Sequence, residues 1–99
     1  MIIVTGAIRL PANCVAQARP HMRELIEATR QEAGCLLYAW AEDVLDPGLL
    51  RMIEHWRDWP SFLAHDRSPH AAKWKATVAQ IGILHRDMRA HEGSNERAL

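Results

Sequence analysis

Two histidines beside a break between two helices are the residues best suited to proton transfer. Segment 54–70 holds three of the six histidines and two of the four tryptophans. Ser68 followed by proline predicts a helix that begins at Pro69, and Asp58 predicts the cap of a shorter helix over about 59–65. His65 then lies at a helix C-terminus and His70 at a helix N-terminus, which favours a protonated His65 and a neutral His70. The pair predicts an acid/base site; the alternative is two solvated histidines in a loop.

The composition is that of a small globular protein. Its 99 residues indicate a single domain, 1–99, of which about 92–99 form a polar tail. Apolar residues make up 48% and charged residues 24% of the chain, while twelve basic and twelve acidic residues cancel. Without a basic cluster, nucleic acid and anionic membrane surfaces are not expected partners. The sequence lacks the roughly 20-residue apolar run of a membrane span and a basic signal-peptide start, so we expect a cytoplasmic protein.

The two cysteines, Cys14 and Cys35, are expected to be free thiols. They flank a predicted helix of about 20 residues, which would separate them by about 30 Å. A disulfide requires Cα atoms within about 7 Å of each other. Free thiols agree with a reducing compartment, and Cys35, in a predicted strand, is expected to act as a small buried apolar residue.

Periodicity and turn residues give the order of the elements. A helix over about 16–33 either begins at Pro20 or begins near Asn13 and kinks, and we favour the kinked helix. Gly34 ends it, and Asp46-Pro47-Gly48 is a tight turn that joins two strands into a hairpin. Predicted strands cover 2–10, 35–43, 49–56 and 81–89, and the later helices cover about 59–65 and 69–79.

This order, β-α-β-β-α-β, predicts an α+β, ferredoxin-like fold with an antiparallel sheet covered by helices on one face. The other face of the sheet is still partly apolar. One chain cannot cover it, so we expect a homodimer formed through the open sheet face.

Four motifs carry a resemblance to a known family. They are residues 32–38 (EAGCLLY), 46–48 (DPG), 54–56 (EHW) and 64–70 (AHDRSPH). With them the chain, over about residues 1–90, resembles the antibiotic biosynthesis monooxygenase (ABM) domain family, small dimeric α+β barrel proteins that include quinol monooxygenases. The resemblance implies a homodimer whose two sheets close into a barrel, with a ligand cavity between sheet and helices in each subunit. It also implies oxygenation of a small aromatic substrate, quinol-like or polyphenolic, by O2 without metal, flavin or haem, hence no cofactor.

The resemblance also directs the choice of site residues. His65 and His70 are the candidate catalytic bases, because a base poised near neutral pH favours histidine. Tyr38 and Trp56 are expected to line the cavity and orient an aromatic ring, although both suit a core role equally well. Glu54 is expected to bind substrate or orient a histidine, or to form a structural ion pair with an arginine of the last strand, Arg86 or Arg89. Replacing either histidine by alanine is expected to leave folding intact, because both lie at a helix joint.

Other chemistries fit less well. Haem-degrading relatives use an Asn, a Trp and a His, and the positions aligned with them here are Ile8, His65 and Lys75. No metal site is expected, because neither H-x-H nor H-E-x-x-H occurs and the two candidate histidines are separated by a helix break.

Two alternatives to the monooxygenase remain open. An isomerase of a small phosphorylated carbonyl compound would need inward cations, for which Arg51, Arg86 and Lys73 are the candidates. A non-catalytic, small-ligand-binding stress-response module would have its cavity filled by side chains.

Overall fold

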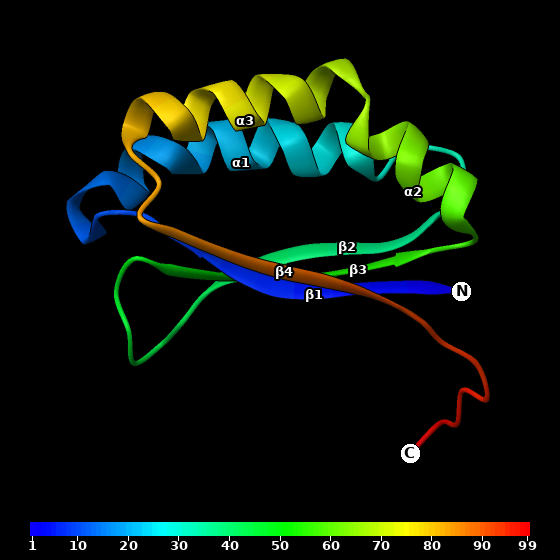
Figure 1. Ribbon diagram of the computed structural model, residues 1–99. Coiled ribbons are helices and arrows are strands. Elements are labelled where there is room, and N and C mark those ends of the chain that lie inside the picture. Colours follow the sequence, from blue (N-terminus) through cyan, green and yellow to red (C-terminus); the bar gives the residue numbers. More distant parts are fainter.

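The computed structural model, which describes residues 1–99, is a two-layer α+β structure with the predicted ferredoxin-like order. The four strands form one antiparallel sheet in the order β2-β3-β1-β4, and the helices cover one of its faces (Figure 1). In chain order the elements are β1 (Ile2–Arg9), a 3-10 turn (Ala12–Cys14), α1 (Val15–Thr29), β2 (Cys35–Glu42), β3 (Leu49–Trp56), α2 (Trp59–Asp66), α3 (Pro69–Ile81) and β4 (His85–Glu92).

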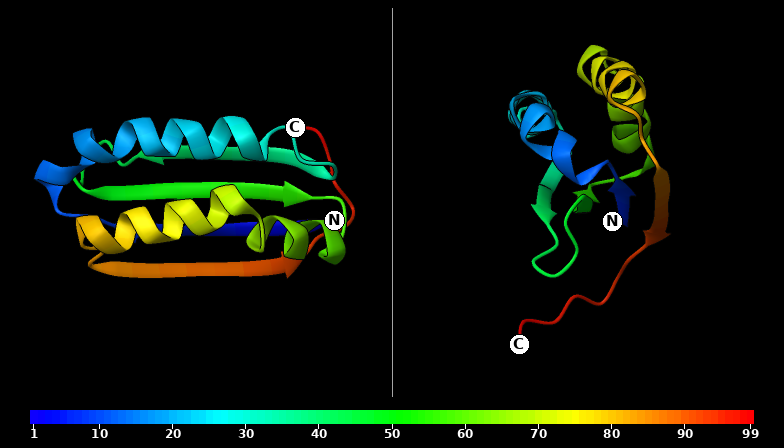
Figure 2. Two further views of the ribbon diagram at one scale, coloured as in Figure 1. Left: turned by 90° about the horizontal axis from the view of Figure 1, so that it is seen from above. Right: turned by 90° about the vertical axis from the view of Figure 1, so that its left-hand side faces the viewer.

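The core lies between the sheet and the helices. Figure 2 shows α1 above one side of the sheet and α2 with α3 above the other, while the opposite face carries no layer. Alternate residues of the two central strands point toward the helices, as a period of two requires. The buried cluster is made of Ile2, Val4, Ile8, Leu10, Val15, Ala18, Met22, Leu25, Tyr38, Leu50, Met52, Trp56, Trp74 and Val78.

The first helix begins close to where the pattern suggested but ends earlier. It begins at Val15 after the 3-10 turn, so Pro20 lies inside it, as the favoured alternative predicted. It ends at Thr29, and the chain then turns through residues 30–34. Gly34 adopts a φ of 83°, and a Cβ placed there would meet the Ser61 side chain at the start of α2. Glycine therefore allows this turn to pack close to α2, which brings residue 32 near the end of that helix.

The last strand was placed too early in the sequence. The prediction was 81–89, whereas β4 covers His85–Glu92. Ile81 is the last residue of α3, and Gly82, with a φ of 103°, caps it. An apolar run of four residues does not distinguish a helix end from a strand start, which explains the error. Glu92, expected in the tail, ends the strand, and its Oε1 accepts a hydrogen bond of 2.9 Å from Trp59 Nε1.

The uncovered face of the sheet mixes apolar and charged side chains. Leu37 and Ile53 are 39% and 36% exposed, and Arg51 pairs with Asp43 at 2.9 Å. A second copy covering this face stays a prediction. Cys14 and Cys35 are free, as expected. None of the helices combines the length and the apolar character that crossing a membrane requires.

Candidate active site

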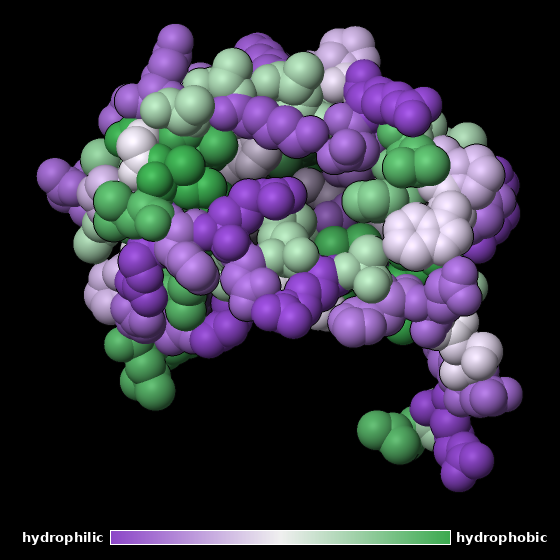
Figure 3. All heavy atoms as spheres, in the orientation of Figure 1, coloured by the Kyte–Doolittle hydropathy of each residue, from purple (hydrophilic) through white to green (hydrophobic).

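A cavity of about 530 Å³ lies between the sheet and the two later helices. Eleven of its sixteen lining residues are hydrophobic, and Tyr38, Trp40, Phe62 and Trp74 give it aromatic walls. In Figure 3, apolar residues lie recessed between hydrophilic side chains on the face that carries α3 and β4. Both the volume and this lining are typical of sites for small organic ligands, and the aromatic walls suit a flat ring.

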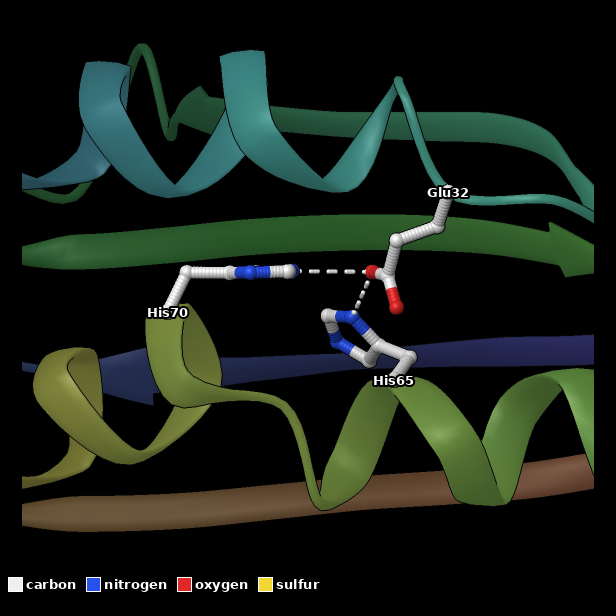
Figure 4. A group of neighbouring side chains, drawn as sticks. All are labelled: Glu32, His65 and His70. Atoms are coloured by element: carbon white, nitrogen blue, oxygen red, sulfur yellow. Dashed lines mark hydrogen bonds and ion pairs between the residues drawn. The ribbon is translucent and has the colours of Figure 1, made fainter.

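His65 is buried in the wall of this cavity, in the last turn of α2. Its side chain is 9% exposed, and its ring stacks on Trp56 with 4.8 Å between centroids and lies 5.4 Å from the ring of Tyr38. Its Nδ1 is 2.7 Å from Oε2 of Glu32 (Figure 4). Because a carboxylate only accepts hydrogen bonds, Nδ1 carries the proton and Nε2 keeps the lone pair.

The protonation expected for His65 from its helix position is wrong. Burial lowers the pKa of His65, and the nearby Glu32 carboxylate opposes that effect only in part. The desolvation of a charged imidazolium thus outweighs the carboxylate. The imidazole is neutral at neutral pH, so Nε2 can take up a proton.

His70 approaches the same carboxylate from the other side. It lies in the first turn of α3, with Nε2 3.0 Å from Oε2 of Glu32. Ser68 fixes the joint, since its Oγ accepts from Ala71 N at 3.2 Å and donates to His65 O at 2.6 Å. His70 is not among the residues that line the cavity. Of the two predicted bases, His65 is therefore the one that lines the cavity.

Glu32 is the residue that the sequence reasoning missed. It lies in the turn after α1, 33 residues before His65 and 38 before His70, and its Oε2 contacts both rings. Glu32 begins one of the four motifs, but nothing local indicates that this carboxylate reaches histidines on two other helices. Only the early end of α1 and the glycine turn at Gly34 bring it there.

Glu54 and Trp56 form a buried, hydrogen-bonded pair next to the imidazole of His65. They are 2% and 0% exposed, and Trp56 Nε1 donates to Glu54 Oε1 at 2.8 Å. Burial raises the pKa of Glu54 to about 7. Glu54 lines the cavity, and its Oε1 lies 3.9 Å from His65 Nε2, too far for a direct hydrogen bond. Trp56 lies outside the lining, against the face of His65.

The arginine partner expected for Glu54 is absent. Arg89 is exposed and bonds Asp87 at 3.1 Å, while Arg86 lines the cavity without an ion pair to Glu54. The hydrogen-bond partner of Glu54 is instead the indole N–H of Trp56. The Glu54 carboxyl thus lies buried near His65, and burial raises its pKa.

Tyr38 lies in the cavity wall and is 3% exposed. Burial raises the pKa of its phenol, so the hydroxyl stays protonated at neutral pH and can donate a hydrogen bond.

The cations that an isomerase of a phosphorylated compound would need are mostly outside this cavity. Arg51 pairs with Asp43 and Lys73 with Glu24 on the surface, so Arg86 is the one of the three candidates that lines the cavity. Lys75 also lines it but pairs with Asp66 at 3.0 Å.

Comparison with known proteins adds the family. The sequence model of antibiotic biosynthesis monooxygenases matches residues 1–77, which include all the site residues above except Arg86. The chain belongs to the antibiotic biosynthesis monooxygenase family. This match confirms the resemblance found in the four motifs. A separate comparison with curated proteins found no match.

Solved structures agree with this family and fold. A candidate antibiotic biosynthesis monooxygenase from Deinococcus radiodurans is 27% identical with a TM-score of 0.93, covering 100% of this chain and 98% of that one. Another antibiotic biosynthesis monooxygenase is 25% identical with a TM-score of 0.88, covering 96% and 100%. A conserved protein from Methanosarcina mazei, 24% identical with a TM-score of 0.86 over 94% and 92%, shares the fold. The family and the first two of these structures support monooxygenase chemistry.

Proposed function

We propose that this ABM-family chain is a cofactor-independent monooxygenase that oxidises a quinol-like or polyphenolic small molecule with O2. The observation that carries the proposal is the neutral imidazole of His65 in the wall of an aromatic-lined cavity, with its Nδ1 proton held by Glu32. Such an imidazole is a base of suitable strength for a phenolic hydroxyl at neutral pH.

Deprotonation is the step in which the protein assists. His65 Nε2 takes the hydroxyl proton, and the resulting imidazolium is stabilised by Glu32 at 2.7 Å. The electron-rich anion passes one electron to O2, which removes the spin restriction on their combination. Overall, one dihydroxyaromatic molecule and one O2 give a hydroxyquinone and one water. The apolar walls exclude bulk water from these intermediates.

Three further groups of the cavity support this chemistry. The neutral phenol of Tyr38 and the guanidinium of Arg86 are donors for the oxygen atoms of a bound anion. Glu54, whose pKa is about 7, is placed to accept the proton from His65 after a small movement, because the two side chains are 3.9 Å apart. His70 acts as a positioning residue by holding Glu32.

Oxygen uptake with a reduced naphthoquinol tests the proposal. The assay contains a chelator, and catalase and superoxide dismutase discount autoxidation. We expect saturable uptake that the chelator does not reduce. Uptake no greater than the protein-free background across several quinols would contradict the proposal.

The proposal includes a cytoplasmic homodimer joined through the uncovered sheet face. The half-exposed Leu37 and Ile53 on that face are apolar side chains that a second sheet would bury. Light scattering on the purified chain is expected to give twice the 11.3 kDa chain mass. A monomeric mass at micromolar concentration would contradict this part of the proposal.

A further inference from the structure

Two imidazoles and one carboxylate from three separate elements converge beside the cavity. Glu32 comes from the turn after α1, His65 from the end of α2 and His70 from the start of α3 (Figure 4). Each residue offers one atom that could bind a metal ion, and these three atoms lie within 4.8 Å of one another. The side chains are 17%, 9% and 22% exposed, so the group is sheltered but open to solvent on the His70 side. Imidazole nitrogen and carboxylate oxygen are the ligands that zinc and similar ions prefer.

The spacing of these atoms is close to that of a ligand set. A tetrahedral ion with bonds of about 2.1 Å holds its ligands about 3.4 Å apart. The two ring nitrogens are 2.7 and 3.0 Å from the shared Glu32 oxygen and within 4.8 Å of each other, so binding an ion would move both away from that oxygen by less than 1 Å and bring them toward each other. Ser68, which bonds both helices, fixes the joint that positions the two rings.

A second carboxyl, that of Glu54, lies near the imidazole of His65. Metal-bound histidines commonly donate their other ring N–H to a carboxylate, which orients the ring and strengthens its bond to the metal. If Nδ1 of His65 binds an ion, the proton moves to Nε2, and Glu54 Oε1 is 3.9 Å from that nitrogen. The chain thus supplies three ligands and an outer carboxyl that a small movement would bring within hydrogen-bond distance of Nε2.

We propose that Glu32, His65 and His70 bind one divalent transition-metal ion of the zinc class, and that this ion switches off His65 as a base. The loss of activity rests on the proposed function, because a metal-bound His65 carries its proton on Nε2 and has no lone pair for a quinol. The binding itself does not depend on any activity. The simpler explanation of the geometry, two N–H groups sharing one carboxylate, is the other outcome of the test.

Binding is measured on tag-free protein stripped with a chelator and then dialysed. Titration with Co²⁺ is expected to give visible absorption bands of a four-coordinate site that saturate at one equivalent. Zn²⁺ is expected to abolish these bands by displacement. Glu32→Gln and His70→Gln are each expected to weaken Co²⁺ binding at least ten-fold, whereas His21→Gln, an exposed histidine on α1, leaves it unchanged. Bands that are absent, or that both site variants retain, would overturn the metal site.

Measurements of oxygen uptake test the metal site and the proposed oxygenase activity independently of each other. We expect Zn²⁺ to lower quinol-dependent uptake at one equivalent and the chelator to restore it. Co²⁺ binding without inhibition would overturn the switching role, and inhibition without one-to-one binding would overturn the site. If the bands form but uptake is absent in every metal state, the site stands and the oxygenase proposal fails. If uptake requires the metal, the site also stands, and the cofactor-independent mechanism and the switching role both fail.

Discussion

Replacing His65 by glutamine is expected to lower quinol-dependent oxygen uptake by about 10²–10⁴-fold, the usual contribution of a positioned general base. An amide cannot accept the hydroxyl proton, whereas the neutral imidazole can. Glutamine is chosen because it fills much of the same space against Trp56 and can still donate to Glu32. Initial rates at saturating quinol, compared with those of the unmodified chain, measure the effect. Uptake within two-fold of the unmodified chain, with the fold intact, would place the base elsewhere.

Alanine is a poorer choice at this position, contrary to the sequence-based expectation that it leaves folding intact. The side chain is 9% exposed, and its ring packs beside Trp56, Tyr38 and a carboxylate. His65→Ala would open a cavity and leave Glu32 with one partner, so we expect it to lower the free energy of unfolding by about 2 kcal/mol. Circular dichroism and urea unfolding of both variants distinguish a lost base from a lost fold.

Glu32→Gln serves as the control for positioning. The Glu32 carboxylate raises the pKa of His65 against the larger effect of burial, so its removal lowers that pKa further. Because the base works only when neutral, the acid side of the pH–rate profile should move to lower pH in this variant. A structural role alone would lower the rate without moving the profile.

Local signals predicted the two helices around the site well. Ser61 N donates to Asp58 Oδ1 at 2.9 Å and Ala71 N to Ser68 Oγ at 3.2 Å, which confirms both predicted caps. A cap depends on side chains within four residues, so the sequence contains the whole interaction. The same holds for β3, whose bounds Leu49–Trp56 match the prediction.

The rest of the site depends on contacts between distant segments. Glu32 reaches His65 only because α1, the glycine turn and α2 pack together, and no local pattern encodes that packing. The neutral state of His65 likewise follows from burial, which the helix position visible in the sequence does not reveal. For Glu54 the sequence indicated that a partner was needed and favoured an arginine of the last strand, whereas the partner is the indole two residues away.

Replacing Glu54 by glutamine is expected to remove a large pH dependence of stability. Burial raises the pKa of this carboxyl from 4.5 to about 7 in the folded chain. Well below pH 4.5 the Glu54 carboxyl is protonated in both the folded and the unfolded chain, so its raised pKa does not lower the free energy of unfolding. As the pH rises toward 7, the unfolded chain loses this proton first, so the folded state loses stability by about 1.4 kcal/mol per pH unit, or roughly 3 kcal/mol in all. Above pH 7 the loss levels off.

Glutamine keeps an oxygen that accepts from Trp56 Nε1 but has no proton to lose in this range. The Glu54→Gln variant should therefore match the unmodified chain near pH 4 and exceed its free energy of unfolding by roughly 2–3 kcal/mol near pH 8. His65 acts in the opposite direction: its lowered pKa costs stability as the pH falls below 6.5, but it does so in both proteins and largely cancels in their difference.

Urea unfolding at intervals from pH 4 to 8, with chelator present, gives both curves. Glu27→Gln is the matched control, because that carboxyl is 70% exposed on α1 and its variant should run parallel to the unmodified chain. Parallel curves for Glu54→Gln would mean that Glu54 ionises near its ordinary pKa. A gap that opens between pH 4.5 and 7 would instead establish a carboxyl that exchanges its proton near neutral pH beside His65. Such a group is suited to take over the proton that the imidazole removes from a quinol.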